Sequence, residues 1–251
     1  MAGSSGRLSG CWSPLLWLAL LLAAALGLAE LDGLFRLIEP DSRTVIYGRA
    51  AFIDLLGSHL LLVALAACVS SLVGVGAAIM VTRPWGEDFL PLVSQVASIG
   101  QTIPPVAVLA LAVPALGFGS GPTLFALMLY GLLPILRNSL AGLRGIDPAV
   151  LEAARGMGMA PLQVLWRVEL PLALNVILAG IRTSVTINIA TAAIGSTIGA
   201  STLGDPVISG LVIGNTAFIL QGAILIGLLA VAVDSLFEQL QRRAPGSSQA
   251  K

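Results

Sequence analysis

The sequence predicts an all-α membrane protein, a polytopic helical bundle with about six transmembrane helices. Of 251 residues, 13 are Lys or Arg and 13 are Asp or Glu, so charged residues make up 10% of the chain and apolar residues 57%. A typical soluble domain is about 25% charged and 45–50% apolar. The chain therefore lacks the polar residues that a soluble surface or a disordered segment needs. The second observation is that its apolar residues gather in long stretches.

Six stretches approach or exceed the roughly 20 mostly apolar residues that a transmembrane helix needs. They are Trp12–Ala29, His59–Val81, Leu90–Leu116, Pro122–Leu143, Leu172–Ile198 and Ser209–Phe237. The first follows Arg7 and has two interpretations, an uncleaved anchor, which we favour, or a cleaved signal peptide. The charged stretch Glu30–Asp54 is expected to form an external loop. The sixth stretch is expected to be tilted or to lie partly outside the bilayer.

The positive charges are distributed unevenly between the two predicted sides. Three arginines (Arg36, Arg43 and Arg49) fall on the side opposite the amino terminus, and Arg182 falls inside the fifth stretch. The remaining nine cations share the side of the amino terminus: Arg7, Arg83, Arg137, Arg144, Arg155, Arg167, Arg242, Arg243 and Lys251. Cytoplasmic loops carry an excess of Lys and Arg. We therefore expect both termini to be cytoplasmic in a multi-pass protein of the cytoplasmic (inner) membrane.

These positions divide the chain into three predicted regions and exclude several classes of function. The regions are an anchor with its external loop (1–54), a transmembrane domain (55–237) and a cytoplasmic tail (238–251). Zero net charge argues against a nucleic-acid partner. Cys11, Cys68 and the single histidine, His59, have no metal-ligand spacing, so we expect no metal site and a structural role for His59. Neither a catalytic site nor a phosphate-binding loop for ATP is recognisable.

The predicted internal loop, residues 144–171, reads as a helix–turn–helix. Asp147-Pro148 is a helix start, because Asp caps free amides and Pro fits the first helical position. Gly156 and Gly158 are expected to end that helix. A second short helix should run from Pro161 to about Arg167, with Leu162, Leu165 and Trp166 on one face. Leu170-Pro171 should then break the chain before the fifth membrane helix. The loop either docks on a partner or rests on the lipid surface.

The spacing E-A-A, three residues, G, nine residues, V, one residue, L-P resembles the EAA loop of binding-protein-dependent ABC importer permeases. The matching positions are Glu152, Ala153, Ala154, Gly158, Val168, Leu170 and Pro171. The stretches Ile99–Leu111, Leu136–Met159 and Leu170–Ser184 resemble the osmoprotectant branch, which imports glycine betaine, choline or carnitine. Asn175 departs from this pattern, since relatives usually carry proline there.

This resemblance implies a type I ABC importer permease that couples transport to ATP through the EAA loop. Its expected partners are two ATPase subunits, a second permease copy or paralogue, an extracytoplasmic binding protein and membrane lipid. ATP and Mg would bind the ATPases, leaving no cofactor on this chain. Alternatives are a permease for an amino acid such as methionine, an ion-coupled secondary transporter, or a membrane scaffold without transport.

Polar residues inside the predicted membrane helices are candidates for a translocation path or gate. Ser184, Asn188 and Thr191 fall on one helical face, and they either line the path or act as packing contacts. Arg182 is predicted near the bilayer midplane, where an arginine should face protein or water unless it extends to the membrane surface. Gln101 and Thr102 precede the Pro104-Pro105 pair, which either lines a cavity or makes an ordinary kink.

A small-residue pattern in the second stretch has a purely structural interpretation. Ser70, Gly74 and Ala78 recur every four residues, so they should form one face on which another helix packs closely.

Overall fold

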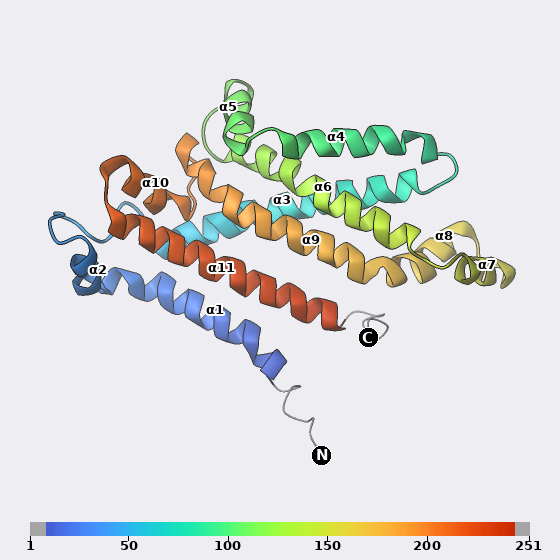
Figure 1. Cartoon of the computed structure of the whole chain (residues 1–251), viewed down its shortest axis with the longest axis horizontal. Coiled ribbons are helices and arrows are strands. Elements are labelled where there is room, and N and C mark those ends of the chain that lie inside the picture. Colours follow the sequence, from blue (N-terminus) through green and yellow to red (C-terminus); the bar gives the residue numbers. More distant parts are fainter. Residues whose placement is uncertain (1–8, 244–251) are drawn as a thin grey trace, which may run out of the picture. The chain divides into compact units, whose positions relative to one another are not determined.

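The computed structural model describes residues 9–243, with side chains from residue 14 onward. Arg7 and Lys251, two of the cations used to orient the chain, lie outside the described residues. Every element in the described range is helical, which confirms the predicted class (Figure 1). The longer elements are α1 (Ser9–Gly27), α2 (Asp32–Ile38), α3 (Phe52–Val81), α4 (Leu90–Thr102), α5 (Pro105–Leu116), α6 (Ser120–Arg144), α7 (Pro148–Gly156), α9 (Leu170–Ala192), α10 (Gly204–Ile213) and α11 (Thr216–Arg243). Shorter turns are η1 (Leu28–Glu30), η2 (Glu87–Phe89), α8 (Pro161–Val164), η3 (Leu165–Glu169) and η4 (Ala193–Ile198).

Four helical runs in the described range are long and apolar enough to cross a membrane. They are Phe52–Val81, Ser120–Arg144, Pro161–Ile198 and Thr216–Arg243. Two broken pairs, Pro14–Glu30 with Asp32–Ile38 and Glu87–Thr102 with Pro105–Leu116, raise the number to as many as six if each pair is one span. The chain is therefore a multi-pass membrane protein, with up to the six spans that the sequence predicts.

The third predicted span is interrupted at its proline pair. Ile103 and Pro104 both have extended backbones, with ψ of 130° and 141°, and Pro105 opens α5. Proline lacks the amide that a continuing helix needs, and it disfavours helical geometry in the residue before it. The interruption at this position follows the sequence expectation.

The predicted bounds of the sixth span are wrong. Ser209 belongs to α10, which ends at Gly214 with a φ of 71°, in the left-handed region that glycine tolerates. The Asn215 side chain then caps α11, since its oxygen accepts a hydrogen bond of 3.0 Å from the amide of Phe218. At the other end, α11 continues through Arg243, so the first residues of the predicted tail are helical.

The chain folds into two compact units that cut across the three predicted regions. Unit 1 comprises the described residues up to Ala66, with Pro104–Leu127 and Thr186–Leu236. Unit 2 comprises Ala67–Ile103, Met128–Val185 and the described residues from Phe237 on. The long helices α3, α6, α9 and α11 contribute a part to each unit.

In unit 1, the segment between α2 and α3 is held on α11 rather than left free. The fully buried amide of Gln221 accepts a hydrogen bond from the Tyr47 backbone at 3.0 Å and donates one to the Val45 carbonyl at 2.6 Å. Asn215 also donates to the Thr44 carbonyl at 2.8 Å. These bonds give the predicted external loop a fixed conformation.

His59 is fully buried in unit 1 and connects three helical segments. Its Nε2 lies 3.1 Å from the Ile189 carbonyl in α9, and its Nδ1 lies 3.3 Å from the Leu203 amide, just before α10. A carbonyl only accepts and an amide only donates, so this arrangement needs the neutral ring with its proton on Nε2. The expected structural role of His59 is confirmed.

In unit 2, α3, α4, α6 and α9 enclose a tight apolar core. A Cβ at Gly74 would lie 3.0 Å from the Ile135 side chain, and Ser70 donates to the Met128 carbonyl at 2.9 Å. The predicted close-packing face of α3 is therefore confirmed. Between α6 and α9, a Cβ at Gly180 would lie 2.6 Å from the Cβ of Asn138. Small residues allow such close approach of membrane helices.

Candidate functional site

The candidate site is the loop between α6 and α9, and it begins with the predicted cap. The Asp147 side chain accepts a hydrogen bond of 2.9 Å from the Ala149 amide, and Pro148 occupies the first helical position of α7. Carboxylate caps of this kind satisfy amides that have no partner inside the helix. Figure 1 shows α7 and α8 lying beyond the adjoining ends of α6 and α9.

The end of α7 also follows the sequence. Gly158 has a φ of 82°, a left-handed conformation that other residues adopt only with strain. A Cβ on Gly158 would meet nothing within 4 Å, so backbone conformation rather than space explains the glycine. The turn is exposed and directs the chain from α7 into α8.

The three residues of the E-A-A sequence do not share one environment. Glu152 and Ala153 are exposed, whereas Ala154 is 1% exposed and packs inward. Ala154 therefore does not lie on the accessible face of the loop. A 3.6-residue period turns adjacent residues by 100°, so one of three consecutive residues readily faces the core. Of the three, Glu152 and Ala153 belong to the accessible surface of α7, which also includes Val150 and Arg155.

The second short helix departs from the prediction in two ways. Leu165 is 9% exposed, whereas Leu162 and Trp166 are both 65% exposed, so the three do not form one buried face. In addition, Leu170 is helical, with φ −62° and ψ −44°, and α8 continues into α9 through the π-helical turn η3. The expected break at Leu170-Pro171 is therefore wrong. The wider turn accommodates a proline, which could not be placed within a regular α-helix without loss of a hydrogen bond.

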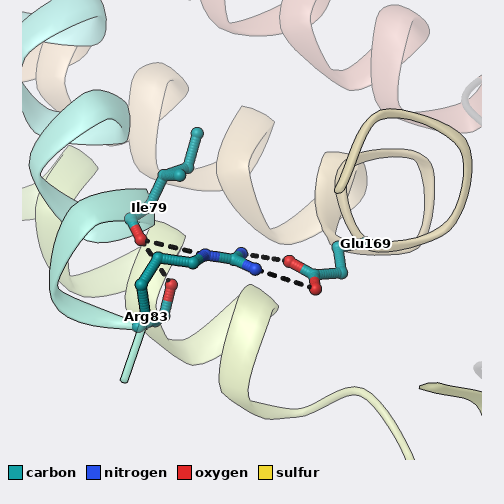
Figure 2. Close-up of polar contacts among 4 residues, drawn as sticks. Ile79, Arg83 and Glu169 are labelled. Atoms are coloured by element: carbon teal, nitrogen blue, oxygen red, sulfur yellow. Dashed lines mark hydrogen bonds and ion pairs between the residues drawn. The ribbon is translucent and has the colours of Figure 1, made fainter. Parts of the chain in front are cut away.

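The structure reveals an ion pair that we did not predict, between Arg83 and Glu169. Arg83 follows α3, and its Nε donates to the Ile79 carbonyl at 3.3 Å. Its two terminal nitrogens bind the two carboxylate oxygens of Glu169, one at 3.1 Å and the other by a shorter contact (Figure 2). The side chains are 22% and 8% exposed. Figure 2 shows the guanidinium extending from the end of α3 to the carboxylate.

Glu169 lies inside the E-A-A spacing, between the matching positions Val168 and Leu170. The signal that could have found the pair is an acid at the start of a membrane helix, which needs a partner. Arg83 was the first cation after the second predicted span, on the same predicted side. The matching residues Val168, Leu170 and Pro171 are themselves half-buried.

A polar cavity of about 370 Å³ lies beside this pair. Its lining includes Thr82, Pro84, Arg144, Leu151, Arg155 and the ion pair itself. One wall is formed by the turn after α3 and another by α7. The first turn of α7 is therefore separated from the turn after α3 by polar space.

Arg182 is hydrogen-bonded to the last turns of α11. Its guanidinium donates to the Gln241 side chain at 3.3 Å, and Gln241 donates to the Asn175 carbonyl at 3.3 Å. Gln241 belongs to the polar end of α11, beyond its apolar stretch. The helical run that contains Arg182 begins at Pro161, not Leu172, and the midplane position of Arg182 stays a prediction. The bond from Gln241 uses the backbone carbonyl of Asn175, so it does not depend on the side chain by which this position departs from the family pattern.

The polar stripe of α9 is largely buried inside the chain. Ser184 and Asn188 are fully buried, and their side-chain polar atoms have no hydrogen-bond partner within residues 14–243. Thr191 is half-buried and donates to the Ile187 carbonyl at 2.9 Å. A buried polar group without a partner costs about 1–3 kcal/mol. Ser184 and Asn188 therefore carry a free-energy cost in this conformation.

Gln101 and Thr102 differ in their exposure and in their hydrogen-bond partners. Gln101 is half-buried and donates to the Tyr130 carbonyl at 2.9 Å, so it fastens α4 to α6. The Tyr130 hydroxyl in turn donates to the Ile103 carbonyl, one of the groups released by the proline pair. Thr102 is exposed and bonds only within its own turn, to the Ile99 carbonyl at 2.9 Å.

Comparisons with known proteins identify the family. Residues 70–244 match the family described as the inner membrane component of binding-protein-dependent transport systems. This chain belongs to that family. The permease family thus accounts for the E-A-A spacing in the loop and for the apolar helices on either side of it.

Curated relatives of this permease are similar over much of their length. It is 40% identical to the osmoprotectant import permease protein OsmY of Salmonella typhimurium, over 74% of this chain and 78% of that protein. It is 42% identical to the choline transport system permease protein OpuBD of Bacillus subtilis, with 75% and 83% covered. It is 46% identical to the carnitine transport permease protein OpuCD of Listeria monocytogenes, with 60% and 68% covered.

Solved structures agree on the fold. A chain of the methionine ABC transporter MetNI, in an inward-facing conformation, matches with a TM-score of 0.69 at 21% sequence identity. The match covers 76% of this chain and 94% of that chain. Because the identity is low, this likeness establishes the arrangement of the permease helices and nothing about the solute.

Proposed function

We propose that this chain is the permease subunit of an ATP-driven ABC importer for quaternary-amine osmoprotectants of the glycine betaine, choline or carnitine type. One observation carries the proposal. Relatives with 40–46% identity, spread over three bacterial genera, are all named as permeases for osmoprotectants, choline or carnitine. A methionine permease is the second candidate, and the only support for it is a fold match at 21% identity.

The proposed partners follow from the family and from the loop. A binding protein delivers the solute outside the membrane, two ATPase subunits bind ATP and Mg, and a second permease copy or paralogue completes the path. The exposed face of α7, with Glu152 and Ala153, docks on an ATPase, and Gly158 sets the turn that presents it. This places both termini in the cytoplasm, in line with the distribution of cations.

Ser184 and Asn188 are the residues we propose for the translocation path. Their polar atoms lack partners within the described side chains, and a change that exposes this face to water would satisfy them. Thr191 continues the same face. Gln101 and Arg182 have polar partners instead, which supports a role in holding helices together.

Uptake of labelled solutes tests the proposal. Cells with and without this gene are given glycine betaine, choline, carnitine and methionine in separate assays. The expected result is gene-dependent uptake of at least one quaternary amine and none of methionine. Gene-dependent uptake of methionine alone would contradict the assignment of the solute class while leaving the family assignment intact.

A further inference from the structure

The Arg83–Glu169 pair has the geometry of a specific connection rather than a loose surface contact. Two guanidinium nitrogens face two carboxylate oxygens, and the third is held by the Ile79 carbonyl. Bidentate pairs of this kind are directional and roughly twice as strong as neutral hydrogen bonds. Because the Glu169 side chain is 8% exposed, loss of Arg83 would leave a poorly hydrated charge.

The turn that carries Arg83 is firmly built onto α3. The Thr82 hydroxyl donates to the Ile79 carbonyl at 2.9 Å, and the Gly86 amide donates to the Arg83 carbonyl at 2.9 Å. A Cβ at Gly86 would collide with the Met80 carbonyl, so the turn lies directly against the end of the helix. A force applied to the Arg83 side chain is therefore transmitted to α3.

Glu169 is connected closely enough to the α7–α8 loop to move with it. It is the last residue of the π-helical turn that joins α8 to α9. The amide of Met159, before α8, donates to the Ala154 carbonyl of α7 at 3.3 Å, so α7 and α8 are linked by hydrogen bonding. The polar cavity separates the first turn of α7 from the turn after α3. The ion pair joins the turn after α3 to the π-helical turn that follows α8, beside this cavity.

We propose that Arg83 and Glu169 are positioning residues that carry motion of the α7–α8 loop to α3. The chain itself connects the loop to α9, and the ion pair provides a second, non-covalent connection to α3. Both helices then respond together when an ATPase displaces the loop. This inference rests on the proposed function, because it assumes that an ATPase docks on α7.

The test uses the assembled importer in proteoliposomes, with its ATPase and binding protein. The variants are Arg83→Gln, Glu169→Gln, the charge exchange Arg83→Glu with Glu169→Arg, and Arg144→Gln. Arg144 lines the same cavity at the end of α6 and has no ion pair among the described residues, so it is the matched control. Two quantities are measured for each assembled complex, solute uptake and ATP hydrolysis stimulated by the binding protein.

The expected result is a fall of about tenfold in solute taken up per ATP for each single Gln variant, within the range typical of coupling between linked sites. The charge exchange restores at least half of the ratio, and Arg144→Gln leaves it unchanged. A merely structural pair would lower the yield of complex without changing this ratio, and that outcome overturns the proposal. So does a charge exchange that remains as impaired as the single variants.

The proposed function can fail separately. If the unaltered complex hydrolyses ATP but imports no quaternary amine, the solute class is wrong. The solute taken up per ATP is then measured with whichever solute the unaltered complex does import. A ratio in the Gln variants equal to that of Arg144→Gln overturns the proposal, and a lowered ratio supports it.

Discussion

Helix α3 is fastened to α9 by two joints of opposite chemistry, one in each unit. The neutral joint consists of His59, the Ile189 carbonyl and the Leu203 amide, and its imidazole is fully buried. The ionic joint consists of Arg83 and Glu169 and keeps some contact with solvent. A neutral ring satisfies buried backbone groups without bringing charge into a medium of low dielectric. An ion pair at the edge of a polar cavity keeps part of its hydration, so its charges cost less to hold there than in the core.

The comparison teaches that the two ends of α3 have different tasks. The neutral joint suits a contact buried in the core of unit 1, whereas the ionic joint suits a directional connection beside the α7–α8 loop. Substitutions at the neutral joint should therefore affect the stability of the whole fold. Substitutions near the ionic joint should affect the loop or coupling while the fold persists.

The largest effect is expected for His59→Leu. Leucine fills most of the space but leaves the Ile189 carbonyl and the Leu203 amide without partners, at about 1–3 kcal/mol each. The free energy of unfolding should fall by about 3 kcal/mol. Denaturant titration in detergent, followed by far-UV circular dichroism, measures it. Leu61→Ala, at a position 60% exposed on the same helix, is the control and should change stability much less. Equal losses of unfolding free energy in the two variants would show that the hydrogen bonds of His59 do not stabilise the fold specifically.

A smaller and local effect is expected for Asp147→Ala. The variant removes the side-chain cap of α7, which is worth about 1 kcal/mol. Amide hydrogen exchange should quicken in the first turn of α7, while the unfolding midpoint stays within error of the parent. Asp147→Asn, which keeps a capping oxygen, should behave like the parent. A drop in global stability would show that α7 belongs to the fixed part of the structure.

A still smaller change in stability is expected when the ionic joint is replaced by apolar residues, Arg83→Met with Glu169→Leu. Apolar replacement of a whole ion pair is often neutral or stabilising, since both desolvation costs vanish. We expect the free energy of unfolding to change by less than about 1 kcal/mol. Uptake should nevertheless fall, because an apolar contact lacks the directional hydrogen bonds that join Arg83 to Glu169. Full uptake by this double variant would mean that any contact between residues 83 and 169 is enough for transport.

The smallest effect is that of salt. Raising ionic strength from 0.01 M to 1 M shortens the screening length from about 30 Å to about 3 Å. The stability difference between the parent and Arg83→Gln should shrink by a few tenths of a kcal/mol. The difference between the parent and His59→Leu should stay constant, since no charge is involved. Parallel denaturant titrations at the two salt concentrations provide both values.

Features governed by local rules were predictable from the sequence. The cap at Asp147, the left-handed turn at Gly158 and the interruption at Pro104 depend on a few neighbouring residues. The close-packing face at Gly74 follows from helical periodicity alone. At these positions the backbone geometry is set by residues close in the sequence.

Features that depend on distant residues were missed or misplaced. Arg83 and Glu169 are 86 residues apart, and His59 and Leu203 are 144 apart, so no spacing reveals either joint. The start of the fifth helical run at Pro161 was missed, because the rule that proline breaks a helix placed a break at Pro171. The π-helical turn overrides this rule at Pro171, because its wider ring no longer needs the missing amide.

The uninterrupted helical run from Pro161 to Ile198 makes α9 part of a lever. Its 38 residues span about 57 Å at 1.5 Å per residue, nearly twice the hydrocarbon thickness of about 30 Å. A tilt of about 10° about one end would move the other end by about 10 Å. If the run tilts as one body, a small rotation at the loop would therefore become a displacement comparable with the width of a helix.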